Sequence, residues 1–151
     1  MIKCLIVLIL FMSGSFLSAQ TTAVEIENLL NSRTITYAQA VRVILDASEV
    51  KITPSYAVAF RFAEDQGWLP KGVTPDSPAR LDSIALLCMH SFGIKGGLMY
   101  TITGKPRYAY RELAYRGVIQ GRVDPMMKVS GEKLLFMVGR LLTIKGEGER
   151  I

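Results

Sequence analysis

The sequence holds little of what most catalytic and metal sites require. Its 151 residues include one histidine, His90, and two cysteines, Cys4 and Cys88. His90 has no second histidine or adjacent cysteine with which to share a metal, which argues against a zinc-type site. The paired carboxylates Glu64 and Asp65 fall at a predicted helix end rather than in an enclosed setting that would perturb their pKa. We therefore expect no enzyme, no metal and no cofactor.

Long apolar runs are also missing. The run from Cys4 to Met12 is only nine residues long, whereas a membrane-spanning helix needs about 20. Lys3 precedes this run and the small residue Ala19 stands before Gln20, an arrangement typical of a cleaved signal peptide over residues 1–19. The alternative is a short N-terminal membrane anchor. The sequence predicts an exported protein of the periplasm, cell envelope or cell surface, with no stable membrane span once the signal is cleaved.

Acidic residues are scarce in the second half of the chain. Residues 80–145 hold eleven bases and four acids, a net charge of +7, whereas residues 20–79 hold five bases and seven acids. A basic half on an exported chain predicts an anionic envelope polymer, lipid head groups or an acidic partner. Export disfavours nucleic acid as a partner.

The chain does contain a 50-residue self-repeat, in which residues 54–70 return as residues 104–120. Each copy is typical of a helix that ends at glycine, followed by a short apolar turn, a proline and a second helix. Stacked helical units of this length predict a binding or scaffolding module. The coinciding residues include Arg61 and Arg111, Gly67 and Gly117, Trp68 and Val118, Leu69 and Ile119, and Pro75 and Pro125.

Apolar spacing and capping residues predict an all-α fold with about five main helices. Cys88 lies among apolar neighbours in the third helix, so we expect a buried thiol rather than a reactive one. Residues 98–102 form a short β-prone stretch. The expected organisation is a signal peptide over 1–19, a polar lead-in or short helix over 20–34, a helical repeat domain over 35–145 and a flexible tail over 146–151. The expected helices begin at Thr36, at Pro54 or Ser55, after Pro78, at Pro106 or Arg107 and after Ser130, and the last ends near Ile144.

Several short motifs resemble the S-layer homology family. Residues 111–121 are similar to the end of the first helix in that family's repeat, with its glycine turn, and residues 124–133 stand where its loop and second-helix cap lie. Residues 35–40 are similar to the cap of a preceding repeat, and residues 67–70 to the turn of a middle one. The resemblance covers about residues 35–145. It implies a compact array of helical hairpins that attaches to an anionic cell-wall glycan.

The chain departs from the family pattern at the cap motif. An arginine at its second position is implied in gripping an acidic wall polysaccharide, and here Tyr37, Leu81 and Gly131 occupy that position. A one-residue shift in the middle copy would supply Arg80 instead. Gln39 and Lys133 stand where the outer caps of the family carry glutamate.

A basic and tyrosine-rich segment is the main candidate for ligand binding. On a helix, Arg107 and Arg111 are one turn apart, as are Arg111 and Tyr115, so we expect one exposed stripe that carries both residue types. Guanidinium groups bind carboxylates bidentately, and tyrosine rings stack on sugars. The alternative is that Tyr108 and Tyr115 are core residues and the arginines are only solvated. Trp68 is either an apolar plug between repeats or a stacking platform. The candidate residues are Arg107, Tyr108, Arg111, Tyr115, Arg116 and Arg122, together with Trp68 and Arg80.

Two function classes follow from these observations. The first is non-enzymatic attachment to an anionic cell-wall or envelope glycan outside the cytoplasm. The second is a protein-interaction scaffold or adaptor in a periplasmic or cell-surface complex. A small hydrolase has no constellation of residues behind it.

Overall fold

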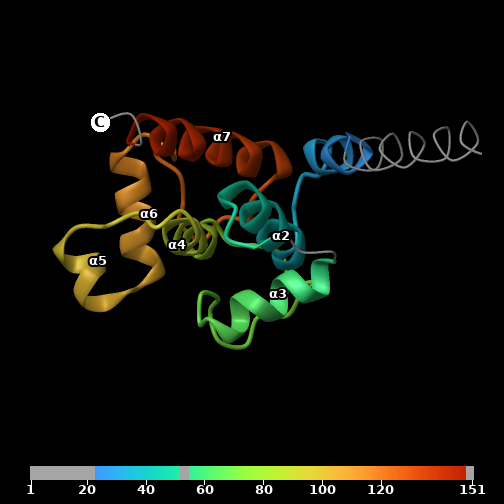
Figure 1. Cartoon of the computed structure of the whole chain (residues 1–151), viewed down its shortest axis with the longest axis horizontal. Coiled ribbons are helices and arrows are strands. Elements are labelled where there is room, and N and C mark those ends of the chain that lie inside the picture. The colour runs from blue at the N-terminus through green and yellow to red at the C-terminus, as the bar shows by residue number, and fades with distance from the viewer. Residues whose placement is uncertain (1–22, 52–54, 149–151) are drawn as a thin grey trace, which may run out of the picture.

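The computed structural model describes residues 23–51 and 55–148, and over these residues the chain is helical with two isolated β-bridges and no strand. The predicted all-α class is confirmed. The predicted signal peptide lies outside the described residues. A helical segment covers residues 23–30, and the helices that follow are α2 (Tyr37–Ser48), α3 (Tyr56–Asp65), α4 (Leu81–Ser91), α5 (Leu98–Thr103), α6 (Pro106–Tyr115) and α7 (Gly131–Gly148) (Figure 1).

The residues that immediately precede α2, α4 and α7 meet at the centre of the molecule. The Ile35 N–H donates to the carbonyl of Val129, the Ala79 N–H donates to that of Ile35, and the Val129 N–H donates to that of Ala79. Each of these three hydrogen bonds is 2.9 Å long, and all three side chains are fully buried. Ile35, Ala79 and Val129 thus form a closed set of hydrogen-bonded residues, the central ring. Since each bond joins equivalent positions in two different segments, the three segments are related by an approximate threefold axis.

The same segments pair further along the chain, which fixes how the copies align. Two residues after each member of the central ring, a backbone N–H donates to a neighbouring segment. These donors are the first residues of α2, α4 and α7. Thr36, Arg80 and Ser130 are thereby equivalent, so the one-residue shift that would align Arg80 with Tyr37 is wrong. The pairs, each at 3.0 Å, are Tyr37 with Ser77, Leu81 with Met127, and Gly131 with Ser32.

Side chains cap two of these three helix starts as the sequence predicts. The Gln39 N–H donates to Thr36 Oγ1 and the Thr36 N–H donates to Gln39 Oε1, which completes a capping box. The Ser130 hydroxyl accepts from the Lys133 N–H at 3.2 Å. Arg80 makes no side-chain cap, because a guanidinium group carries only donors and cannot accept a hydrogen bond from a backbone N–H.

Glycine ends the two helices of the repeat in the same way. Gly67 and Gly117 have φ angles of 69° and 71°, and each donates its N–H three residues back, at 2.9 Å and 3.1 Å. The next residues, Trp68 and Val118, donate to Ala63 and Leu113 and complete a Schellman motif. The predicted glycine stops are confirmed, and they turn each chain segment back toward the central ring.

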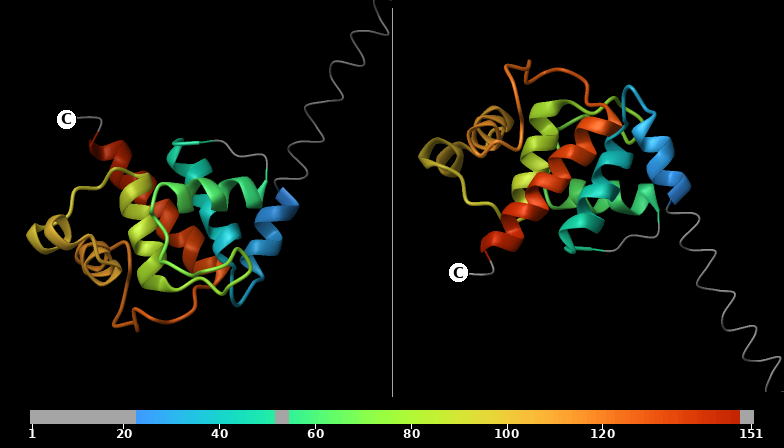
Figure 2. Two further views of the ribbon diagram at one scale, coloured as in Figure 1. Left: turned by 90° about the horizontal axis from the view of Figure 1, so that it is seen from below. Right: turned by 90° about the horizontal axis from the view of Figure 1, so that it is seen from above.

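The core forms where α2, α4 and α7 pack together, with α3 against α2 and α6 against α4 (Figures 1 and 2). α4 is the most enclosed helix, since Leu81 to Met89 are all buried. Cys88 lies within it at 0% exposure, and burial raises the pKa of its thiol to about 12. The thiol is therefore buried, as the sequence predicts, and is held in its unreactive protonated form.

Two segments differ from expectation. The predicted β-prone stretch over 98–102 is wrong, because these residues form α5. The Thr101 hydroxyl donates to the Gly97 carbonyl and the Thr103 hydroxyl donates to the Met99 carbonyl, so local bonds favour a helix where no neighbouring strand is present. Of the two alternatives for the lead-in, the short helix is the one found, at residues 23–30. The last helix continues past Ile144 to Gly148.

Candidate functional site

A groove of about 310 Å³ lies between α5 and α6. It brings together three of the predicted binding residues, Tyr108, Arg111 and Tyr115 from α6, and sets them opposite the start of α5. Tyr115 is 91% exposed, which is unusual for a large aromatic side chain. The other lining residues are Gly97, Leu98, Met99, Tyr100 and Glu112.

The buried face of α6 determines which side chains reach this groove. Ala109 and Leu113 are fully buried against the core, so residues 108, 111 and 115 fall on the opposite, solvent-facing side. The Gly97 N–H donates to Glu112 Oε1 at 2.9 Å and ties the start of α5 to α6. Helix packing and one charged hydrogen bond therefore hold the two walls together.

The arginines of the predicted patch do not all lie at the groove. Arg107 and Arg111 are exposed, and within the described residues neither guanidinium makes an ion pair or hydrogen bond. Arg116 instead donates to the Lys95 carbonyl at 2.7 Å and lies 4.0 Å from Glu112. It lines a different cavity, beside α7. Arg122 is exposed in the loop between α6 and α7.

Trp68 belongs to a row of aromatic rings that links α3, α4 and α5. Its indole meets the edge of Phe62 at 5.8 Å between centroids and stacks on His90 at 5.6 Å with an interplanar angle of 3°. The ring of Tyr100 follows at 6.4 Å from that of His90. Trp68 thus packs between neighbouring helices while part of its surface remains exposed.

Sequence reasoning missed His90 as a packing residue, because it considered the side chain only as a metal ligand. Partial burial lowers the pKa of His90 and raises the pKa of Tyr100. Tyr100 also lines the groove, so the aromatic row ends at the candidate binding site.

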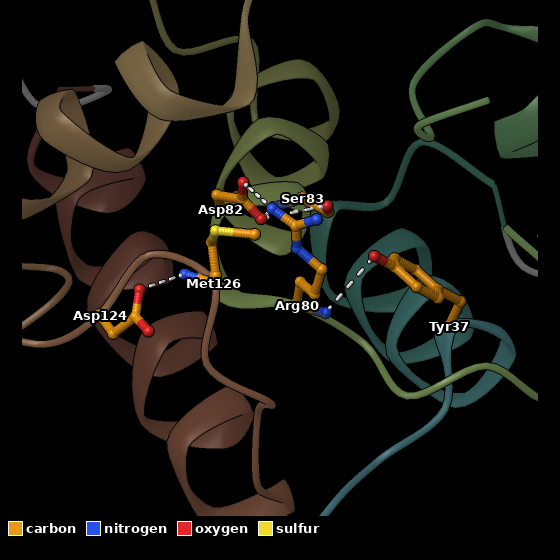
Figure 3. Close-up of polar contacts among 6 residues, drawn as sticks. All are labelled: Tyr37, Arg80, Asp82, Ser83, Asp124 and Met126. Carbon is orange, nitrogen blue, oxygen red and sulfur yellow. Dashed lines mark hydrogen bonds and ion pairs between the residues drawn. The ribbon is translucent and has the colours of Figure 1, made fainter. Parts of the chain in front are cut away.

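Arg80 lies in a separate cluster near the central ring (Figure 3). Its Nη2 is 2.8 Å from Asp82 Oδ2, and the other oxygen of that carboxylate accepts from the N–H and hydroxyl of Ser83. The Arg80 N–H donates to the Tyr37 hydroxyl at 3.4 Å. Asp82 therefore neutralises Arg80, which makes this arginine a weaker anion site than Arg111.

A second polar cluster, missed by the sequence, flanks an apolar cleft of about 260 Å³. Glu25 accepts from Arg42 Nη1 at 2.8 Å and from the Tyr56 hydroxyl, and the Arg42 guanidinium lies 4.8 Å from the Tyr56 ring centroid. Burial and, to a smaller extent, Glu25 raise the pKa of Tyr56. The apolar lining consists of Ile26, Leu29, Val43, Ala47, Leu135 and Val138.

Among residues 23–51 and 55–148, no three histidine, cysteine or acidic side chains are grouped so that they could hold a metal ion. In the same ranges, no helix has the length and apolar character needed to cross a bilayer. Searches against known protein families, curated proteins and solved structures find no match to this chain.

Proposed function

We propose that the protein is a non-enzymatic module of S-layer-homology type that acts outside the cytoplasm. It holds an anionic cell-wall or envelope glycan in the groove between α5 and α6. The observation that carries this proposal is that Tyr108, Arg111 and Tyr115 line one groove.

The chemistry of the groove fits an acidic sugar. Within the described residues the Arg111 guanidinium has no internal partner, so its donors are available to a carboxylate or phosphate. Tyr108 and Tyr115 offer flat faces on which a pyranose ring can stack. The groove's volume of about 310 Å³ is at the lower end of the range for small-ligand sites, which suits a short stretch of polymer.

The arrangement of the helix pairs supports the S-layer-homology type, because three pairs of helices joined by loops surround one axis. The pairs are the helix at 23–30 with α2, α3 with α4, and α6 with α7. The family's gripping position at each cap does not supply a cation here. Tyr37 and Leu81 are 1% and 0% exposed, and Gly131 is buried. Binding of an anion is therefore expected at the α5–α6 groove rather than at the caps.

Co-sedimentation with purified cell-wall sacculi across a salt series tests this proposal, using the predicted mature form from Gln20 to Ile151. We expect pelleting that weakens as salt rises, since exposed charge pairs are screened. Arg111→Gln should lower affinity about tenfold, in line with the loss of one charged hydrogen-bonded contact.

Arg61→Gln is the matched control, because Arg61 is the repeat counterpart of Arg111 and is also exposed, on α3. It should leave pelleting unchanged. Equal losses in the two variants, or pelleting that ignores salt, would contradict a specific site at Arg111.

The apolar cleft beside Glu25 favours the second candidate, a protein-interaction scaffold. Val24, Ile26 and Leu30 are 57%, 45% and 48% exposed on the helix at 23–30, so an apolar surface continues out of the cleft. Under this candidate, Ile26→Asp should abolish co-purification of one defined protein at fixed stoichiometry and leave binding to sacculi unchanged. Retention of that protein by the variant would exclude the cleft as its docking site.

A further inference from the structure

The short helix α5 presents its apolar side chains to solvent. None of its residues is buried, and Leu98, Met99 and Ile102 are 74%, 50% and 69% exposed. Figure 2 shows α5 at the outer edge of the molecule, beyond α6 and away from the central helices. Three neighbouring exposed aliphatic side chains on one protruding element are typical of a docking surface.

The arm that carries α5, residues 94–105, is nevertheless held in a defined position. Glu112 accepts from the Gly97 N–H at one end, and Gly104 ends the helix with a φ of 58° at the other. The Tyr100 ring contacts His90 of α4. The apolar side chains therefore project from an anchored helix, and little ordering is needed when they are buried by a partner.

Exposed basic residues flank this apolar tip in the sequence. From Lys95 to Arg111 the sequence contains four bases and no acid. The four bases, Lys95, Lys105, Arg107 and Arg111, are all exposed. Tyr115, 91% exposed on the adjoining helix, adds an aromatic ring of the kind that concentrates at membrane–water interfaces.

We propose that the α5 arm docks on the surface of an anionic lipid bilayer. Leu98, Met99 and Ile102 insert at the level of the head groups, and the basic residues around them contact anionic head groups. Shallow insertion of an apolar face combined with a cationic rim is the general basis of interfacial membrane binding. This surface shares Leu98, Met99, Arg111 and Tyr115 with the glycan groove. The proposal does not depend on glycan binding, and its tests use Ile102, Lys95 and Lys105, which do not line the groove.

Charge favours a lipid surface over a second copy of the chain. Two α5 arms face to face would bring their four-base rims together, and like charges in contact are destabilising. An anionic bilayer instead meets the whole rim with the opposite sign. An acidic protein is the remaining competitor, and it is separated from lipid by using vesicles that contain no protein.

A dye attached at position 102 tests the proposal locally in the full-length chain. Ile102→Cys in a Cys4→Ser background gives one reactive thiol, because Cys88 is 0% exposed with a raised pKa. We expect the emission of an environment-sensitive dye at this position to shift to the blue with vesicles of phosphatidylglycerol and phosphatidylcholine. Nitroxide-labelled lipid should then quench the dye.

Val58→Cys in the same background is the matched control, because Val58 is 43% exposed on α3. Its dye should not respond to the vesicles. The local readout is needed because apolar residues 4–12 can also bind vesicles in the full-length chain. An unresponsive dye at position 102, or an equal response at position 58, would overturn the proposal.

Vesicle flotation tests the cationic rim. Lys95→Gln/Lys105→Gln should reduce partitioning into anionic vesicles about thirtyfold, given a contribution of about 1 kcal/mol from each base near a charged surface. Lys71→Gln/Lys128→Gln removes the same charge from two other exposed positions and should have little effect. Equal effects of the two double variants would exclude docking through this arm. A shift of the dye that requires no vesicles would identify self-association instead.

Discussion

The central ring and the α5 arm use aliphatic residues in opposite ways. Ile35 is 0% exposed and its backbone bonds to two other segments of the chain. Ile102 is 69% exposed, and the polar side chains of its helix bond within the arm itself. Hydrogen bonds between distant segments draw the ring's side chains into a shared core, whereas local bonds let α5 form without burying any side chain. The ring therefore provides stability, and the arm keeps apolar surface available for a partner.

The sharpest test of this difference is the same substitution in both regions. Ile35→Ala should lower the free energy of unfolding by about 4 kcal/mol, because it opens a cavity in a core that cannot fully collapse. Ile102→Ala should change it by less than about 0.5 kcal/mol. Urea denaturation followed by circular dichroism measures both. Similar losses in the two variants would show that α5 packs against the core more than its exposure indicates.

Glycine at position 131 is the second point at which the ring is vulnerable. A Cβ atom there would overlap the backbone carbonyl of Leu29. Leu29 lies in the last turn of the helix at 23–30. Gly131→Ala should therefore cost about 3 kcal/mol of stability, as overpacking against backbone does.

Gly139→Ala is the control on the same helix. A Cβ atom at this position meets nothing within 4 Å, so alanine should stabilise α7 by up to about 1 kcal/mol through helix propensity. A neutral Gly131→Ala would mean that the helix at 23–30 can move away from α7 at little cost.

Substitutions at the two glycine stops should have effects intermediate between those in the central ring and those in the α5 arm. Gly67→Ala and Gly117→Ala each force alanine into a left-handed conformation, at a cost of about 1 kcal/mol. A Cβ atom at Gly67 meets nothing within 4 Å, and at Gly117 it meets only the flexible end of Arg140. Thermal denaturation should thus show nearly equal shifts, and a much larger loss at one site would break the equivalence of the two copies.

Local patterns explain which parts of this fold were predictable. The capping box at Thr36 and the stops at Gly67 and Gly117 involve residues close together in the sequence, and the sequence predicts each of them. The ring of Ile35, Ala79 and Val129 joins segments that are far apart in the sequence. The self-repeat indicated two equivalent copies and the resemblance at residues 35–40 indicated part of a third. Only the hydrogen bonds between segments align all three and place Arg80 at the N-cap position of α4.

The candidate site was predictable in part for the same reason. Helical spacing predicts a shared face for Arg111 and Tyr115, and both line the groove. Arg116 is predicted with them because it belongs to the same arginine- and tyrosine-rich segment, but its partner is the Lys95 carbonyl, on a distant loop. The opposite wall of the groove could not be predicted, because β-branched residues in α5 suggested a strand and the threonine hydroxyl bonds that favour helix depend on the local backbone.

His90 connects the two regions, and its titration gives the smallest expected effect. Its pKa is lowered by burial in the folded chain, whereas the unfolded chain should have the ordinary value of about 6.5. As the pH falls below about 6.5 the unfolded state takes up a proton first, so stability decreases until the pH passes the lower folded pKa. Trp68, the only tryptophan, stacks on His90 and reports this step directly. Its fluorescence should change with a midpoint below pH 6.5, and the change should vanish in His90→Gln. A midpoint at or above 6.5 would mean that the imidazole is solvated and that the row from Trp68 to Tyr100 does not hold the arm against α4.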